Sequence, residues 1–206
     1  PYGPEFARAH VDLPRNLVGL VVAMADKLET LVGMFGIGNL PTGDKDPFAL
    51  RRHALGVIRM LRESSLTISL SDIIGQTVAV FGSGITDPHV PLTAFFYDRL
   101  SASLREQGFS AQEVEAVLAL RPQQLSDITR RLQAVRAFVA LPESQALAAA
   151  NKRIGNILKK ASEVQGDVNT NLLTEAAEKA LFQTMQQLTP EARKLWAAGD
   201  YTASLQ

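Results

Sequence analysis

The sequence contains no cysteine and only three histidines among its 206 residues. The absence of cysteine excludes disulfide bonds, thiolate catalysis and metal sites with sulfur ligands. The histidines, His10, His53 and His89, are not spaced as metal ligands are, so the sequence predicts no metal site. It also lacks an apolar run of the roughly 18–20 residues that a membrane span needs. No signal peptide is recognisable, and we expect a cytoplasmic protein.

The charges balance, with 21 Lys and Arg against 21 Asp and Glu. Net charge therefore does not indicate whether the partner is a nucleic acid, and local clusters of charge must decide. Hydrophobic residues make up 46% of the chain, which is enough for an ordinary globular core. The chain starts at Pro1 without a methionine, and we expect it to be a piece of a longer protein.

Strand-like alternation is absent, and nearly every segment has the apolar periodicity of a helix. The sequence therefore predicts an all-α, multi-helix bundle. The predicted helices cover 12–36, 46–64, 70–82, 91–108, 110–120, 125–141, 142–161, 174–188 and 189–199. The stretch GSGITDPHVP is the best candidate for a linker, and we place a boundary there between helical regions 1–88 and 89–206.

Capping residues set the expected helix ends. Pro14 after Asp12 predicts the start of the first helix, and Gly36 its end. Asp46 is expected as the N-cap of the second helix, with Pro47 as its first residue. Two further starts are predicted, by a capping box from Ser110 to Glu113 and by Thr189 followed by Pro190.

The stretch GIGNLPTGDKDPFALRR, from Gly36 to Arg52, raises the possibility of a phosphate-binding loop. Gly38 and Gly43 have the spacing of such a loop, but Asp44 stands where its lysine belongs and Lys45 comes one place late. A carboxylate at this position would repel a phosphate. We therefore interpret the stretch as a connection between two helices.

Four arginines of the second predicted helix raise a separate question. Arg51 and Arg62 fall inside its apolar arc, where an arginine usually carries its head to a carboxylate. The carboxylates nearest in sequence are Asp26, Asp44 and Asp46. Arg52 and Arg59 fall together at the edge of the arc, and they are candidates either for structural ion pairs or for contact with RNA phosphate.

A second cluster of charge lies on the predicted helix over 142–161. At ~100° per residue, Leu147, Ile154, Ile157 and Leu158 form one face. The opposite face carries Lys152, Arg153, Asn156, Lys159 and Lys160. Cations without an intervening acid suit a polyanion backbone, although a merely solvated face is the alternative. Gly155 costs ~1 kcal/mol relative to alanine in mid-helix, which indicates close approach by a helix or a nucleic-acid backbone.

No catalytic constellation is recognisable in the sequence. Asp26 is the only acid in a strongly apolar helical stretch, and a lone buried carboxylate is costly unless it is bonded. We predict that Asp26 is a structural acid, paired with Lys27 or Arg51, and not a metal ligand.

Three stretches carry a resemblance to a known family. ADKLETLVGMFGIGNLPTGDKDPFALRRHALGVIRML closely resembles the signature of the β subunit of bacterial glycyl-tRNA synthetase. FFYDRLSASLREQGFSAQEVEAVLALRP and ALAAANKRIGNILKK are similar to the same family, in the same order. The resemblance covers about Leu13 to Lys160 and is weaker over the last forty residues.

The resemblance implies a ligase that attaches glycine to tRNA-Gly with ATP, built from α and β subunits, usually two of each. It places ATP, Mg and the adenylation site on the α subunit, so this chain is expected to hold no cofactor and to be inactive alone. It implies that 1–88 is the end of an HD-like domain and 89–206 part of a DALR-type anticodon-binding domain. The alternatives are a fragment of a metal-dependent HD-type phosphohydrolase, for which Asp26 resembles the last metal ligand, and a scaffold that docks a partner subunit.

Overall fold

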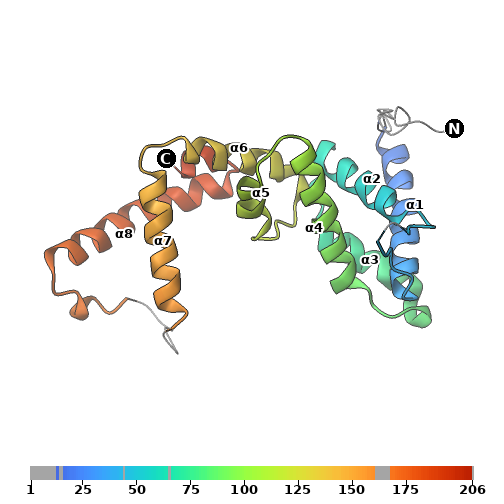
Figure 1. Cartoon of the computed structure of the whole chain (residues 1–206), viewed down its shortest axis with the longest axis horizontal. Coiled ribbons are helices and arrows are strands. Elements are labelled where there is room, and N and C mark those ends of the chain that lie inside the picture. Colours follow the sequence, from blue (N-terminus) through green and yellow to red (C-terminus); the bar gives the residue numbers. More distant parts are fainter. Residues whose placement is uncertain (1–12, 14–15, 44, 65, 161–167, 206) are drawn as a thin grey trace. The chain divides into compact units, whose positions relative to one another are not determined.

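The computed structural model describes residues 13, 16–43, 45–64, 66–160 and 168–205. Among the described residues, helices are joined by turns and loops, and there is no strand beyond one isolated bridge between Thr42 and Lys45, so the all-α prediction is confirmed (Figure 1). The α-helices are α1 (Leu17–Gly36), α2 (Leu50–Glu63), α3 (Leu70–Phe81), α4 (His89–Glu106), α5 (Ala111–Leu118), α6 (Ile128–Val139), α7 (Ser144–Leu158), α8 (Ala176–Ala197) and α9 (Tyr201–Ser204). Short 3-10 turns are η2 (Gly82–Gly84), η3 (Leu125–Asp127) and η4 (Thr170–Leu172).

The chain divides into two compact units, Pro1–Ile128 and Thr129–Gln206. In the first unit α4 packs against α1, α2 and α3. The compact units therefore divide later in the chain than the predicted boundary at residue 88. That boundary separates two types of family domain, and it stays a prediction.

The first unit has a continuous apolar core. α1 and α2 share its largest helix–helix interface, and Leu31, Val32, Ala54 and Val57 are completely buried. Gly56 of α2 lies against the side chain of Lys27 in α1, because a Cβ at Gly56 would lie 2.9 Å from Cε of Lys27. The other fully buried side chains of this unit include Ile74, Leu92, Phe96, Leu100 and Leu104.

α1 ends at Gly36 as predicted, and packing supplies a further reason. A Cβ at Gly36 would lie 2.7 Å from Ile85, and the Gly36 carbonyl accepts a hydrogen bond from Thr86 N at 3.1 Å. The predicted linker is thus held against α1. The start of α1 differs from the prediction: the helix begins at Leu17, and the Asn16 side chain accepts a hydrogen bond from Gly19 N at 2.6 Å. Asp12 and Pro14, the predicted start, lie outside the described residues.

α2 begins at Leu50, three residues later than predicted. Asp46 and Pro47 instead open a turn, closed by a hydrogen bond from Ala49 N to Asp46 O at 3.1 Å. The Asp46 carboxylate still caps the helix, because it accepts hydrogen bonds from Leu50 N at 2.7 Å and Arg51 N at 3.0 Å. Ala49 takes a left-handed conformation (φ 53°), which joins this turn to the helix.

The capping box at the start of α5 is confirmed, with Ser110 N donating to Glu113 and Glu113 N donating to the Ser110 hydroxyl. The predicted break at Thr189 and Pro190 is wrong, because α8 runs through both residues. Thr189 Oγ1 donates to the Met185 carbonyl at 2.6 Å, so the hydroxyl bonds within the helix and does not cap a new one. A proline removes a single N–H, and the helix continues past it.

The second unit is built differently. Among its described residues, the buried apolar side chains are Leu132, Ala134 and Tyr201. Arg131 of α6 lies against two rings, 4.8 Å from the centroid of Trp196 and 4.5 Å from that of Tyr201. The two rings meet edge to face at 4.8 Å. This cluster ties α6 to the end of α8 and to α9.

Candidate nucleic-acid interface

The basic face predicted on the helix over 142–161 lies on α7. Ser144, the first residue of α7, is buried, and its hydroxyl donates a hydrogen bond to the Val139 carbonyl at 3.1 Å. This bond anchors the N-terminus of the helix. The described residues from Ala149 to Lys160 line a shallow hollow of about 340 Å³ along one face of the helix. Its lining residues are Ala149, Lys152, Arg153, Asn156, Ile157 and Lys160. The structure thus brings four of the five predicted polar residues of α7 together.

The fifth predicted residue, Lys159, lies beside this group. Lys159 is the C-cap of α7, and its N–H bonds to the Gly155 carbonyl at 3.1 Å. Lys160 follows, so both ammonium groups lie just past the negative end of the helix dipole, where a cation is favoured. Their positions alone therefore have a structural explanation as well as a functional one.

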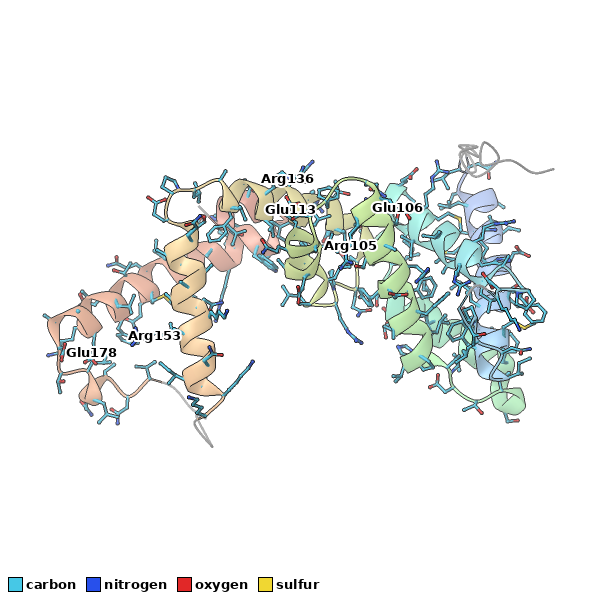
Figure 2. All side chains as sticks on the ribbon, in the orientation of Figure 1. Arg105, Glu106, Glu113, Arg136, Arg153 and Glu178 are labelled. Carbon is cyan, nitrogen blue, oxygen red and sulfur yellow. The ribbon has the colours of Figure 1, made fainter. Side chains whose placement is uncertain are left out.

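The cations of α7 are solvated. Lys152, Arg153, Lys159 and Lys160 are exposed, and Figure 2 shows Arg153 projecting from α7. Between Ser144 and Lys160 the sequence contains no Asp or Glu. Within the part of the chain that the structure describes, no carboxylate is recorded within 4.0 Å of these four groups. This face can therefore attract the closely spaced phosphates of a nucleic-acid backbone.

The apolar face of α7 is also exposed, which the sequence did not indicate. The relative solvent exposure of its apolar residues lies between 49% and 59%; these residues are Leu147, Ile154, Ile157 and Leu158. Apart from its chain neighbours and the nearby backbone of α7, no described atom lies within 4 Å of the position a Cβ would take at Gly155. The close approach that this glycine predicts is thus not made by any described residue.

The sequence predicts an inward pair of arginines on α2, Arg51 and Arg62, and an outward pair, Arg52 and Arg59; in the structure Arg52 is exposed and the other three are partly buried. Arg51 donates to the Gly43 carbonyl and so holds the preceding loop, and Arg62 donates to the Gln107 side chain at 3.3 Å. For Arg51 the partner differs from the expected carboxylate, because its side chain bonds a loop carbonyl and the Asp46 carboxylate accepts from the backbone N–H groups of Leu50 and Arg51. Asp44 lies outside the described residues. Burial lowers the pKa of the Arg62 guanidinium.

The two arginines of the outward pair, Arg52 and Arg59, differ in exposure and in their partners. Arg52 is exposed, whereas Arg59 donates from Nε to Glu63 at 2.9 Å, one turn along α2. Leu55, which lies between them in the sequence, is 41% exposed. An exposed pair of this kind contributes little to stability but compensates the arginine's charge. Of the two arginines, Arg52 is the stronger candidate for RNA contact.

The Asp26 side chain is exposed, so its carboxylate stays in contact with water and the desolvation cost expected for a buried acid does not arise. Its carboxylate lies 4.0 Å from Nζ of Lys27, one of its two predicted partners. Within the described ranges no three His, Asp or Glu side chains gather as a metal site requires. The role of Asp26 as a structural acid stays a prediction.

Two contacts were not foreseen from the sequence. Ser71 Oγ of α3 and Nε2 of His89, the first residue of α4, are hydrogen-bonded at 2.9 Å. The Arg131 cluster is the other. Both join residues from different helices, so no local pattern could have revealed them. His53 is half-buried in α2, and His10 lies outside the described residues.

Comparison with known proteins decides the family. A sequence model of the glycyl-tRNA synthetase beta subunit family matches residues 2–119. The chain belongs to the glycyl-tRNA synthetase beta subunit family. Its 63% identity to the glycine–tRNA ligase beta subunit of Paracidovorax citrulli (strain AAC00-1) extends over 205 residues, and its 64% identity to that of Polaromonas naphthalenivorans (strain CJ2) over 206.

Similarity to these relatives covers all of this chain and 29% of each relative. The chain therefore corresponds to less than a third of a family beta subunit. The resemblance of the sequence to the family is weaker over the last forty residues, but the similarity to these relatives extends through them. Among the described helices, none is both long and apolar enough to cross a membrane.

Proposed function

We propose that this chain is a tRNA-contacting helical region of a glycine–tRNA ligase beta subunit, and that the basic face of α7 binds the phosphate backbone of tRNA-Gly. One observation supports the proposal most strongly. Four exposed cations and Asn156 share one end and face of a helix that has no acid, in a chain of this family. Arg52 on α2 is a second contact point.

The rest of the enzyme supplies the chemistry in this proposal. ATP, Mg and glycine bind to the alpha subunit, usually present in two copies with two beta subunits, in the cytoplasm. The chain itself binds no cofactor and catalyses no step. The phosphohydrolase alternative gains no support from the described residues, because no cluster of candidate ligands accompanies Asp26.

The test is a titration of the chain with tRNA-Gly at two salt concentrations. Each lysine that neutralises a phosphate releases counterions, so log K falls with log salt in proportion to the number of contacts. Replacing Lys159 and Lys160 together by alanine should weaken binding and reduce the salt slope by roughly one to two units. The loss should be similar for other RNAs, because phosphate contacts carry no sequence information.

A matched control is the double replacement of Lys179 and Lys194 by alanine, two exposed lysines of α8. It removes the same net charge and should leave the salt slope unchanged. Circular dichroism checks that both variants keep their helices. Equal slopes for the two double variants would remove α7 from the interface, and no measurable binding by the unsubstituted chain would overturn the proposed function.

A further inference from the structure

Trp196 is the only tryptophan of the chain, and it lies one residue before the end of α8. It belongs to the cluster that ties α6 to the end of α8 and to α9, yet 41% of its surface stays exposed. Tyr201, the second ring of the cluster, is only 5% exposed. Packing therefore explains the position of Tyr201, whereas a large part of Trp196 remains open to a ligand.

The open tryptophan is held in place by its neighbours. The Arg131 guanidinium lies 4.8 Å from the centroid of the Trp196 ring and donates from Nη2 to the Tyr201 hydroxyl at 3.3 Å. Trp196 and Tyr201 meet edge to face, with their ring planes at 73°. Gly199 permits the tight turn between α8 and α9, because its φ is 77°. A side chain that is fixed before binding loses less conformational freedom when a ligand arrives.

Several cations lie on the same elements as the open ring. Arg130 of α6 lies 5.8 Å from the centroid of the second ring of the cluster, and Arg193 is exposed on α8, three residues before the tryptophan. Of the acids near it in sequence, Glu191 lies 3.7 Å from Nζ of Lys194, and Asp200 caps α9. An exposed ring among arginines suits an unpaired nucleotide, because a base stacks on the ring and the guanidinium groups attract the phosphates.

Aromatic and arginine side chains also occur together in protein interfaces, so the rest of the unit has to favour one partner. The second compact unit includes α7, whose basic face carries Lys152, Arg153, Lys159 and Lys160. A protein would need an acidic surface for that face and a separate contact for the ring. A strand of RNA satisfies both, because it carries phosphates and bases along one chain.

We propose that Trp196 is a stacking platform for an unpaired base, and that its ligand is a single-stranded or looped segment of RNA whose phosphates are bound by cations of the same unit. The inference rests on the proposed function, because the basic face of α7 supplies phosphate contacts. It also goes beyond that function, since phosphate contacts do not select unpaired RNA, whereas a base inside a duplex cannot stack on a side chain.

Trp196 emission tests the platform directly, because no other tryptophan contributes to the signal. Three probes are titrated into the unsubstituted chain: a short oligouridylate, an RNA duplex and inorganic polyphosphate. Stacking brings a base into contact with the indole, so the oligouridylate should quench the emission saturably. The duplex and the polyphosphate offer phosphates without an accessible base, so they should bind with little quenching.

Substitutions separate stacking from charge. Trp196→Leu should weaken binding of a labelled oligouridylate roughly tenfold, measured by fluorescence anisotropy, and Trp196→Phe should recover most of this loss because it keeps a flat ring. Replacing Lys159 and Lys160 together by alanine should also weaken binding, yet leave the quenching at saturation unchanged. Leu181→Ala is the control, since it removes an exposed aliphatic side chain of α8 and should change neither signal. Circular dichroism checks that each variant keeps its helices.

The quenching titration of the unsubstituted chain decides the outcome even if a variant fails to fold. Binding of the oligouridylate without quenching would overturn the platform and leave the proposed function in place. Equal quenching by all three probes would also overturn it, because the signal would then follow charge and not stacking. If no RNA binds, the platform and the proposed function both fail. An emission change caused by the alpha subunit but not by RNA would make Trp196 a protein contact, which contradicts the proposal.

Discussion

The two compact units of this chain are stabilised by different means. In the first unit, helices α1 to α5 enclose an apolar core in which Phe96, Leu31 and Leu61 have 1% or less of their surface exposed. In the second unit, the described core consists of Leu132, Ala134 and Tyr201, supplemented by Arg131 between two aromatic rings. Helices with similar apolar periodicity therefore have a buried apolar face in the first unit and an exposed one on α7 and α8 of the second unit.

The single tryptophan makes this comparison measurable. Trp196 belongs to the second unit, so its fluorescence reports on that unit, whereas far-ultraviolet circular dichroism reports on all the helices. Unfolding followed by both signals separates the effect of a substitution on each unit. Three substitutions, from the largest expected effect to the smallest, test how independent the units are.

Phe96→Ala should destabilise the first unit by about 3–5 kcal/mol, because it removes a large buried ring and leaves a cavity. The circular dichroism transition in urea should shift strongly, while the Trp196 transition should move little. Leu172→Ala is the matched control in the second unit, where a side chain that is 73% exposed should change stability by less than ~0.5 kcal/mol. Equal shifts of both signals by Phe96→Ala would show that the units unfold as one.

Asp46→Ala should destabilise the first unit by about 1–2 kcal/mol, since it removes the acceptors of the Leu50 and Arg51 N–H groups at the start of α2. Asp46→Asn keeps one carbonyl oxygen and should recover about half of this loss. Denaturation followed by circular dichroism measures both. An Asp46→Ala variant as stable as the parent would mean that the turn, and not the carboxylate, sets the start of α2.

Arg131→Lys should destabilise the second unit by about 1 kcal/mol, because lysine keeps the charge but lacks the flat group that stacks on both rings. The Trp196 transition should shift and the emission maximum should change. Arg193→Lys, at an exposed position of α8, should alter neither. A shift in circular dichroism without any change in Trp196 emission would contradict the assigned role of the cluster.

Local patterns predicted the fold class and most helix ends. The capping box at Ser110 and the end of α1 at Gly36 depend on residues a few positions apart, so the sequence contains the whole interaction. The basic face of α7 was predictable for the same reason, because helical geometry alone groups Lys152, Arg153, Asn156 and Lys160. The prediction at Thr189 and Pro190 was wrong because this pair occurs both at helix starts and inside continuous helices. The residues on either side continue α8 through the proline.

By itself, then, the sequence determined the helices, the family resemblance and the placement of charge on α7, all of which follow from short-range spacing and residue chemistry. Only the tertiary structure decided that Arg51 holds a loop carbonyl and not a carboxylate, and that Arg59 is paired with Glu63 while Arg52 is free of such a pair among the described residues. It also decided that the apolar side of α7 stays exposed. Burial depends on which helices meet, and that information is spread over the whole chain.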